Sequence, residues 1–142
     1  MTTTTRDTDT GGVLESMILP ALGRGGYAVH AQVVIGKRIG GRRHKIDAIA
    51  TKGDRSVLVS LKWQQVGGTA EQKVPFEVIC LAQALRTSAP PFDAAYLVLG
   101  GEGWTLREFY TGGGLSEHLR YADRVKIVTL ESFVAMANNG RL

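Results

Sequence analysis

Two residues of opposite charge in adjacent predicted strands are the first candidates for chemistry. Asp47 lies in the middle of an apolar β run, where strand propensity disfavours Asp and an unpaired buried carboxylate costs free energy. The next β run ends with Ser60 and Lys62, which share one face because side chains alternate along a strand. A hairpin turn at Gly53-Asp54 would bring Asp47 and Lys62 toward the same end of neighbouring strands. The pair is either part of a reactive site or a structural salt bridge.

Basic residues gather in one short segment rather than along the whole chain. The formal net charge is only +4, but residues 24–52 hold seven basic residues against one acid. Five of the ten residues from Gly36 to Lys45 are basic, and three are glycines. This predicts a flexible cationic loop suited to a phosphate backbone, or a hairpin tip that its charges keep soluble. The candidate nucleic-acid-binding residues are Lys37, Arg38, Arg42, Arg43 and Lys45.

Periodicity predicts an α/β protein with a mixed sheet of about five strands. A helical pattern over residues 67–84 follows the third strand, and Pro75 in a first turn would start the regular helix near Lys73 or Val74. The predicted helices are 13–22, 67–84, 104–110 and 131–138, and the predicted strands are 27–35, 44–51, 56–63, 94–99 and 125–130.

Length and composition indicate one globular domain of 142 residues with 44% apolar content. Residues 1–12 hold six threonines and predict a disordered tail, which leaves 13–142 as the single domain. The longest apolar stretch is Ala94 to Leu99, so no membrane-spanning helix is expected. One cysteine and no signal-peptide core predict a reducing cytoplasm.

From Val13 to Leu99 the chain resembles the PD-(D/E)XK nuclease superfamily, with its restriction-endonuclease-like or Holliday-junction-resolvase-like core. The resemblance lies in the element order αβββαβ, with Asp47 on one strand and Lys62 on the next. It implies a three-layer sandwich in which Asp47 binds Mg²⁺ and Lys62 helps to activate water. Ser60 departs from the pattern, because the family has an acid at this position. Some members with Ser there recruit a glutamate from the following helix.

Glu77 and Glu71 are the two candidates for that recruited glutamate. Glu77 falls about 60° from the centre of the apolar stripe of the helix, near the edge that meets the sheet. Glu71 would precede the regular helix, so its direction cannot be read, and Glu77 is favoured. The alternative for Glu77 is a surface pair with Lys73, four residues earlier.

The resemblance implies further site residues and a metal. The main-chain carbonyl of Leu61 is a metal ligand in the family, and Glu15 matches an acid that completes the metal site in related nucleases. Gln64 would share the face of Lys62 if the strand continued, where the family has polar residues that contact phosphate or water. Mg²⁺ is the expected cofactor, and Mn²⁺ is expected to substitute for it.

These observations favour a Mg²⁺-dependent DNA endonuclease, catalysed by Asp47, Lys62, Glu77 and Gln64. Junction-resolving, structure-dependent and restriction-like enzymes all remain open, and a homodimer is expected because two strands must be cut. The main alternative is a noncatalytic nucleic-acid-binding module in which Ser60 marks the loss of the metal site. A third possibility is an interaction subunit whose basic loop binds an acidic protein.

Overall fold

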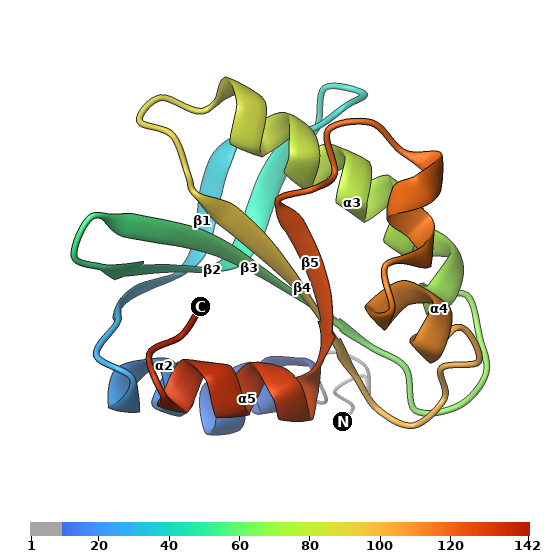
Figure 1. Ribbon diagram of the computed structural model, residues 1–142, viewed down its shortest axis with the longest axis horizontal. Coiled ribbons are helices and arrows are strands. Elements are labelled where there is room, and N and C mark those ends of the chain that lie inside the picture. The colour runs from blue at the N-terminus through green and yellow to red at the C-terminus, as the bar shows by residue number, and fades with distance from the viewer. Residues whose placement is uncertain (1–9) are drawn as a thin grey trace, which may run out of the picture.

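The structure is a computed structural model, and it describes residues 10–142 (Figure 1). Residues 1–9 of the predicted tail lie outside the described residues, and residues 10–13 are helical. No described helix is long and apolar enough to cross a membrane. The elements in chain order are η1 (Leu14–Ile18), α2 (Leu19–Arg24), β1 (Ala28–Lys37), β2 (Arg43–Lys52), β3 (Arg55–Trp63), α3 (Ala70–Thr87), β4 (Ala94–Gly100), α4 (Arg107–Thr111), η2 (Gly114–His118), β5 (Val125–Thr129) and α5 (Leu130–Asn138).

The five strands form one mixed sheet in the order β1-β2-β3-β4-β5. Strands β1, β2 and β3 make an antiparallel meander, and β4 and β5 continue the sheet parallel to β3. The connection between the parallel strands β3 and β4 is α3, since parallel neighbours need a long crossover. Asp47 and Lys62 therefore lie on adjacent strands near one end of the meander, as the sequence predicts.

Helices cover both faces of the sheet and make the three-layer sandwich expected from the sequence (Figure 1). On one face, η1, α2 and α5 bury Ile18, Leu22 and Phe133 against alternate residues of β3 such as Val57 and Val59. On the other face α3 packs over the residues between them, and a separate core forms there. That second core includes Leu58, Leu97, Val78 and Leu81. The helix face that α3 turns to the sheet decides which of its acids can enter the site.

Helix α3 begins at Ala70, three or four residues before the start predicted from Pro75. Proline has no N–H to donate to the carbonyl four residues earlier, which here belongs to Glu71. The hydroxyl of Tyr110 donates to that carbonyl instead, at 2.7 Å. The helix therefore continues through Pro75, because a side chain from α4 replaces the missing hydrogen bond. Glu71 lies in the first turn of the helix and not before it.

The first helical region also differs from the helix predicted over residues 13–22. It continues to Arg24 rather than ending at Leu22, and η1 is a π-helix in which the N–H of Leu19 bonds to the carbonyl of Leu14. Pro20 stands at the start of α2, where its missing N–H is best tolerated. The predicted helix over residues 104–110 is replaced by α4 and η2, and the other strands and α5 fall within two residues of their predicted limits.

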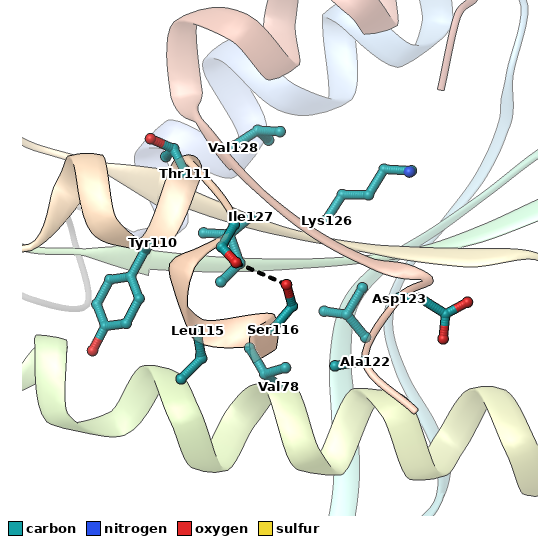
Figure 2. Close-up of a pocket in the computed structure, with 12 residues that line it drawn as sticks. Val78, Tyr110, Thr111, Leu115, Ser116, Ala122, Asp123, Lys126, Ile127 and Val128 are labelled. Carbon is teal, nitrogen blue, oxygen red and sulfur yellow. Dashed lines mark hydrogen bonds between the residues drawn. The ribbon is translucent and has the colours of Figure 1, made fainter. Parts of the chain in front are cut away.

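A pocket of about 310 Å³ lies between α3, the α4–η2 segment and β5 (Figure 2). Val78, Leu115 and Ile127 line it, and Tyr110 closes one side. Asp123 and Lys126 supply its charged side chains, and neither belongs to the pair predicted for chemistry. This pocket is therefore separate from the residues described next.

Candidate active site

An irregularity in β1 and β2 places Asp47. Gln32 has a φ of 56°, in the left-handed region, and its neighbours Ala31 and Val33 pair with the neighbours of Asp47, Ala48 and Ile46. On either side of this point the alternation changes phase: Ile46 packs in the α3 core, whereas Ala48 packs in the opposite core. Paired residues of β2 and β3 follow regularly from Lys52 to Ala48 and stop there. Asp47 thus stands where β2 separates from β3.

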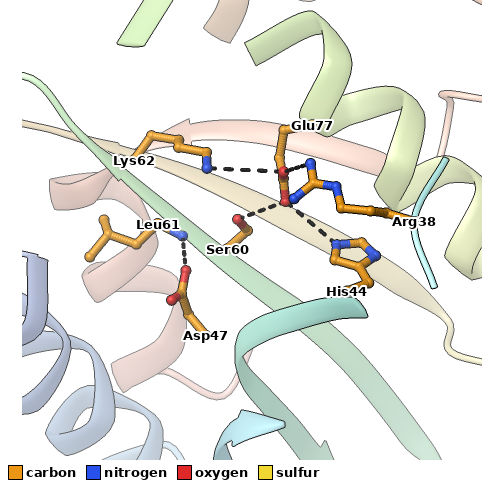
Figure 3. A network of polar contacts seen from close by, with 7 residues as sticks. All are labelled: Arg38, His44, Asp47, Ser60, Leu61, Lys62 and Glu77. Atoms are coloured by element: carbon orange, nitrogen blue, oxygen red, sulfur yellow. Dashed lines mark hydrogen bonds and ion pairs between the residues drawn. The ribbon is translucent and has the colours of Figure 1, made fainter. Parts of the chain in front are cut away.

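The side chain of Asp47 bonds to β3 just beyond the point where main-chain pairing between β2 and β3 ends. One of its oxygens accepts a hydrogen bond from the main-chain N–H of Leu61 at 2.7 Å (Figure 3). Burial raises the pKa of Asp47 above its usual value, although the Leu61 N–H and the charge of Lys62 act to lower it. The ionised form is the one that a nearby cation would favour. The position combines a fixed carboxylate with an environment that leaves its charge only partly compensated.

Glu77 of α3 is the centre of the polar network (Figure 3). Its side chain is only 6% exposed, and it forms an ion pair with Arg38 at 2.9 Å between Nη2 and Oε1. The hydroxyl of Ser60 lies 3.2 Å from Oε2 and donates to it. Lys62 Nζ lies 4.0 Å from Oε1, and His44 Nε2 lies 3.7 Å from Oε2, which is longer than a hydrogen bond. Three basic side chains from two strands and a hairpin tip therefore surround one carboxylate.

These contacts keep Glu77 ionised. Burial alone would raise the pKa of Glu77, but His44, Lys62 and Arg38 together lower it to about 2. The carboxylate is therefore charged throughout the physiological range, although it is buried. An acid with this pKa suits electrostatic or ligand chemistry better than proton transfer near neutral pH.

The short side chain of Ser60 leaves room for the carboxylate of Glu77. Position 60 projects to the same face as Lys62, and its short hydroxyl ends against the Glu77 carboxylate. A longer acidic side chain at position 60 would place its own carboxylate in the space that Glu77 occupies. The Glu77 carboxylate from α3 therefore lies beside both Ser60 and Lys62 of β3.

The structure does not bring the other three predicted site residues into this network. Glu71 accepts hydrogen bonds from the Thr105 hydroxyl at 2.6 Å and from the Thr105 and Leu106 main chains, which lower its pKa. Gln64 is buried, with its amide donating to Gly103 O and accepting from Ala70 N. Both side chains secure the 101–106 loop and the start of α3. Glu15 is exposed on η1, without an ion pair to the network among the described residues.

The predicted basic residues divide into two groups. Lys37, Arg42, Arg43 and Lys45 are exposed on the β1–β2 hairpin, as a phosphate-binding surface requires. Arg38 is only 27% exposed and turns to Glu77. The hairpin tip is therefore joined to the polar network by Arg38.

His44 belongs to the network but was not among the predicted site residues. Strict alternation puts residues 44 and 47 on opposite faces, and the phase change at Asp47 removes that separation. His44 is 2% exposed, and its Nε2 is directed at Glu77 without a hydrogen bond. The signal available in the sequence was an Asp inside an apolar strand, which marks a place where regular alternation can fail.

The site offers oxygen donors to a metal ion. Within residues 10–142, no group of three or more His, Cys, Asp or Glu side chains gathers closely enough to hold an ion. Mg²⁺ differs from zinc in that it takes one or two carboxylates, with waters and substrate phosphates completing its shell. Asp47, Glu77 and the carbonyl of Leu61 are all oxygen donors of that kind. The residues present therefore fit Mg²⁺.

The mixed sheet, with a strand carboxylate, a strand lysine and a helix glutamate at one end, defines an α/β protein with a restriction-endonuclease-like core. The chain belongs to the PD-(D/E)XK nuclease superfamily, because residues 6–141 match the domain of that superfamily. This confirms the resemblance drawn from the element order and from Asp47 and Lys62. No curated protein matches the chain.

A solved structure shares the fold. The crystal structure of AF1548, a protein of unknown function, is similar with a TM-score of 0.50 and 11% sequence identity over 79% of this chain. This chain spans about half of that protein, 54% of its length. At this identity the likeness supports the fold alone.

Proposed function

We propose that the protein is a Mg²⁺-dependent DNA endonuclease that hydrolyses phosphodiester bonds. The observation that carries the proposal is the convergence of Asp47, Lys62 and Glu77 where β2 separates from β3. Membership of a nuclease superfamily supports the class of reaction. The exposed basic residues of the β1–β2 hairpin support a nucleic-acid substrate.

In this proposal Asp47 and Glu77 hold the cation, with the carbonyl of Leu61 and water. Bound Mg²⁺ supplies stabilisation of the negative charge that develops on the phosphate oxygens. Mn²⁺ accepts the same oxygen donors and is expected to substitute. Lys62, about a third exposed and 4.0 Å from Glu77, keeps its ammonium beside the carboxylates, where it orients the attacking water and stabilises the phosphate charge.

Glu77 is preferred over Glu71 as the recruited acid because of their partners. Glu77 contacts Ser60 and lies near Lys62, whereas Glu71 is bonded to Thr105 and Leu106. By the same reasoning we assign Gln64 to support of the 101–106 loop and leave Glu15 as an outer residue. The proposed core is therefore Asp47, Lys62 and Glu77.

Cleavage of a DNA panel tests the proposal. The panel comprises supercoiled plasmid, linear duplex, single strand and four-way junction, each with Mg²⁺, Mn²⁺ or EDTA. We expect metal-dependent cutting that Asp47→Ala, Lys62→Ala and Glu77→Ala each reduce by about 100-fold or more. Glu71→Ala should reduce cutting much less.

Two control variants distinguish the loss of a site residue from the loss of a surface charge. Asp54→Ala and Lys126→Ala remove an exposed acid and an exposed base outside the network, and both should retain full cutting. If the wild type cuts none of these substrates with either metal, the enzyme proposal is wrong. Equal losses in Glu71→Ala and Glu77→Ala would overturn the assignment of the recruited acid.

A noncatalytic nucleic-acid-binding module is the second candidate. It is favoured by one observation: Arg38, Lys62 and His44 already surround Glu77, so a metal ion would compete with them for the carboxylate. Such a module would bind DNA with a steep dependence on salt, without cleavage and without a response to Mg²⁺. Binding measured in EDTA and in Mg²⁺ distinguishes the two.

A homodimer is also part of the proposal, because cutting both strands of a duplex or junction requires two active sites related by symmetry. Light scattering of the purified protein, alone and with DNA, measures the mass directly. A monomer in both conditions would contradict it.

A further inference from the structure

A groove runs across the outer surface of α3, outside the site just described. It has a volume of about 370 Å³ and lies between the tip of the β1–β2 hairpin and the segment of residues 119–122. Its apolar lining is formed by Ile39 from the hairpin, Ile79 and Ala82 from α3, and Leu119 and Ala122. Ile39 and Ile79 remain 44% and 37% exposed, so this apolar surface is open to a ligand.

Tyr121 forms an unusual wall of the groove. Its φ is 63°, a conformation that costs free energy for a residue with a bulky side chain and that persists only where the surroundings hold it. The guanidinium of Arg86 lies 3.8 Å from the centre of the Tyr121 ring, and Tyr121 still remains 57% exposed. The pair presents a flat aromatic and cationic surface to the solvent.

The charge of the groove has one sign. Arg86 and Arg120 line it, and no acidic side chain does so among residues 10–142. At the other end of the outer face of α3, Arg38 lies 5.2 Å from the ring centre of Phe76, which is 44% exposed. Two arginine–aromatic pairs therefore flank the groove along one helix. Arg38 also forms the ion pair with Glu77 of the proposed site.

We infer that this groove binds an unpaired DNA segment of the substrate, with a base stacked on Tyr121 and the backbone held by Arg86 and Arg120. Aromatic side chains beside a cationic track are the general means of binding single strands without sequence preference. The inference rests on the proposed function, because it takes DNA as the ligand. It extends that function to substrates with an unpaired segment beside the cut, such as a flap, gap or opened junction, rather than to uninterrupted duplex.

A polyanion fits this surface better than a second protein chain does. Arg86 and Arg120, in a described lining that holds no acidic side chain, complement phosphates, whereas apolar protein interfaces tend to exclude charge from their centre. A base also needs only one flat partner, which Tyr121 supplies. If a second protein chain occupied the groove instead, Tyr121→Ala would lose self-association.

The test measures binding in EDTA, so that cleavage does not enter the result. Fluorescence anisotropy gives the affinity of wild type, Tyr121→Ala, Tyr121→Phe and Arg86→Ala for a labelled single-stranded oligothymidylate and for a blunt duplex. We expect Tyr121→Ala to weaken single-strand binding by about tenfold and to leave duplex binding within about twofold. Tyr121→Phe should retain wild-type affinity, because the ring and not the hydroxyl provides the stacking.

The matched controls are Phe109→Ala, an exposed aromatic on α4, and Arg141→Ala, an exposed arginine near the end of α5. Neither should change single-strand binding. The inference is overturned if Tyr121→Ala behaves like Phe109→Ala, if single-strand and duplex binding fall equally, or if the variant instead loses self-association.

The groove proposal and the nuclease proposal can be overturned independently of each other. Single-strand binding that depends on Tyr121, in a protein that cuts nothing with metal, would support the groove and overturn the nuclease. Metal-dependent cutting of duplex that Tyr121→Ala leaves unchanged, with no single-strand preference, would support the nuclease and overturn the groove.

Discussion

Glu77 couples the stability of the fold to pH. Its pKa is about 2 in the folded protein against the usual 4.5, so protonation of Glu77 favours the unfolded chain. The stabilisation that follows is complete above about pH 4.5 and is lost as the pH falls toward 2. The difference in pKa corresponds to about 3 kcal/mol of unfolding free energy. Asp47 acts in the opposite direction, because its raised pKa favours the folded state when it is protonated.

We therefore predict that Glu77→Gln is less stable than wild type at neutral pH, and that the deficit shrinks by about 3 kcal/mol between about pH 5 and pH 2. Urea denaturation across this range measures it. Both proteins retain Asp47, and because the charge of Glu77 helps to raise the pKa of Asp47, the comparison includes a smaller, opposite contribution from that coupling. Glu117→Gln, an exposed substitution on η2, should show no such trend. A deficit that stays constant with pH would mean that the partners of Glu77 do not hold it ionised.

The resemblance to the nuclease superfamily, with strand alternation and helix geometry, pointed to Asp47, Lys62 and Glu77, and the structure places all three around one end of β3. Sequence reasoning did not pair Arg38 or His44 with Glu77. Arg38 reaches Glu77 across 39 residues of sequence, and His44 was missed because strand alternation changes phase near Asp47. The left-handed conformation at Gln32 and the phase change at Asp47 arise from pairing between two strands, which no local pattern encodes.

Helix α3 depends on a hydrogen bond from another element. Pro75 leaves the Glu71 carbonyl without its helical donor, and the Tyr110 hydroxyl replaces that donor at 2.7 Å. Tyr110 is 4% exposed, so removing its hydroxyl would leave a buried carbonyl unsatisfied. Such a group costs about 1 to 3 kcal/mol.

We predict that Tyr110→Phe destabilises the protein by about 1 to 2 kcal/mol, and that Pro75→Ala in the same chain removes most of this cost. Alanine at position 75 restores an N–H that can donate to Glu71. Urea denaturation of the wild type, both single variants and the double variant gives the coupling energy. Additive effects would contradict this account of the helix.

The start of α3 shows why element boundaries were harder to predict than element types. Thr69 makes no side-chain cap, and the first free N–H of the helix, at Ala70, donates to Gln64 from the end of β3. Gln64 lies six residues before Ala70, outside the spacing of the usual N-terminal capping motifs, so the sequence shows no such motif here. The apolar periodicity of residues 74–85, in contrast, is local and correctly predicted both the helix and the face it buries.

At the scale of the whole molecule, positive charge is concentrated on the β1–β2 hairpin, whose Lys37, Arg42, Arg43 and Lys45 are exposed. We predict that Arg42→Ala/Arg43→Ala weakens duplex binding in EDTA and lowers the slope of log affinity against log salt by about two. The double variant Lys126→Ala/Arg141→Ala removes the same charge elsewhere and should leave the slope unchanged. Equal slopes for the two double variants would indicate that DNA does not contact the hairpin.

The architecture as a whole was predictable, because alternation and helical periods identify the strands and helices, and their order restricts the possible topologies. The groove on α3 was not predictable. Its walls come from Ile39, Arg86 and Tyr121, which are far apart in the sequence and meet only in the folded chain.

The irregularity at Gln32 has a second effect, on the behaviour of the protein in concentrated solution. β1 is an edge strand, and Val34 on it is 46% exposed. A long regular edge offers unpaired main-chain groups to the strand of another molecule and can seed fibrils. The left-handed residue at Gln32 and the register shift between Val34 and Lys37 interrupt that edge. We therefore expect the distortion beside Asp47 to reduce edge-to-edge association of the sheet as well.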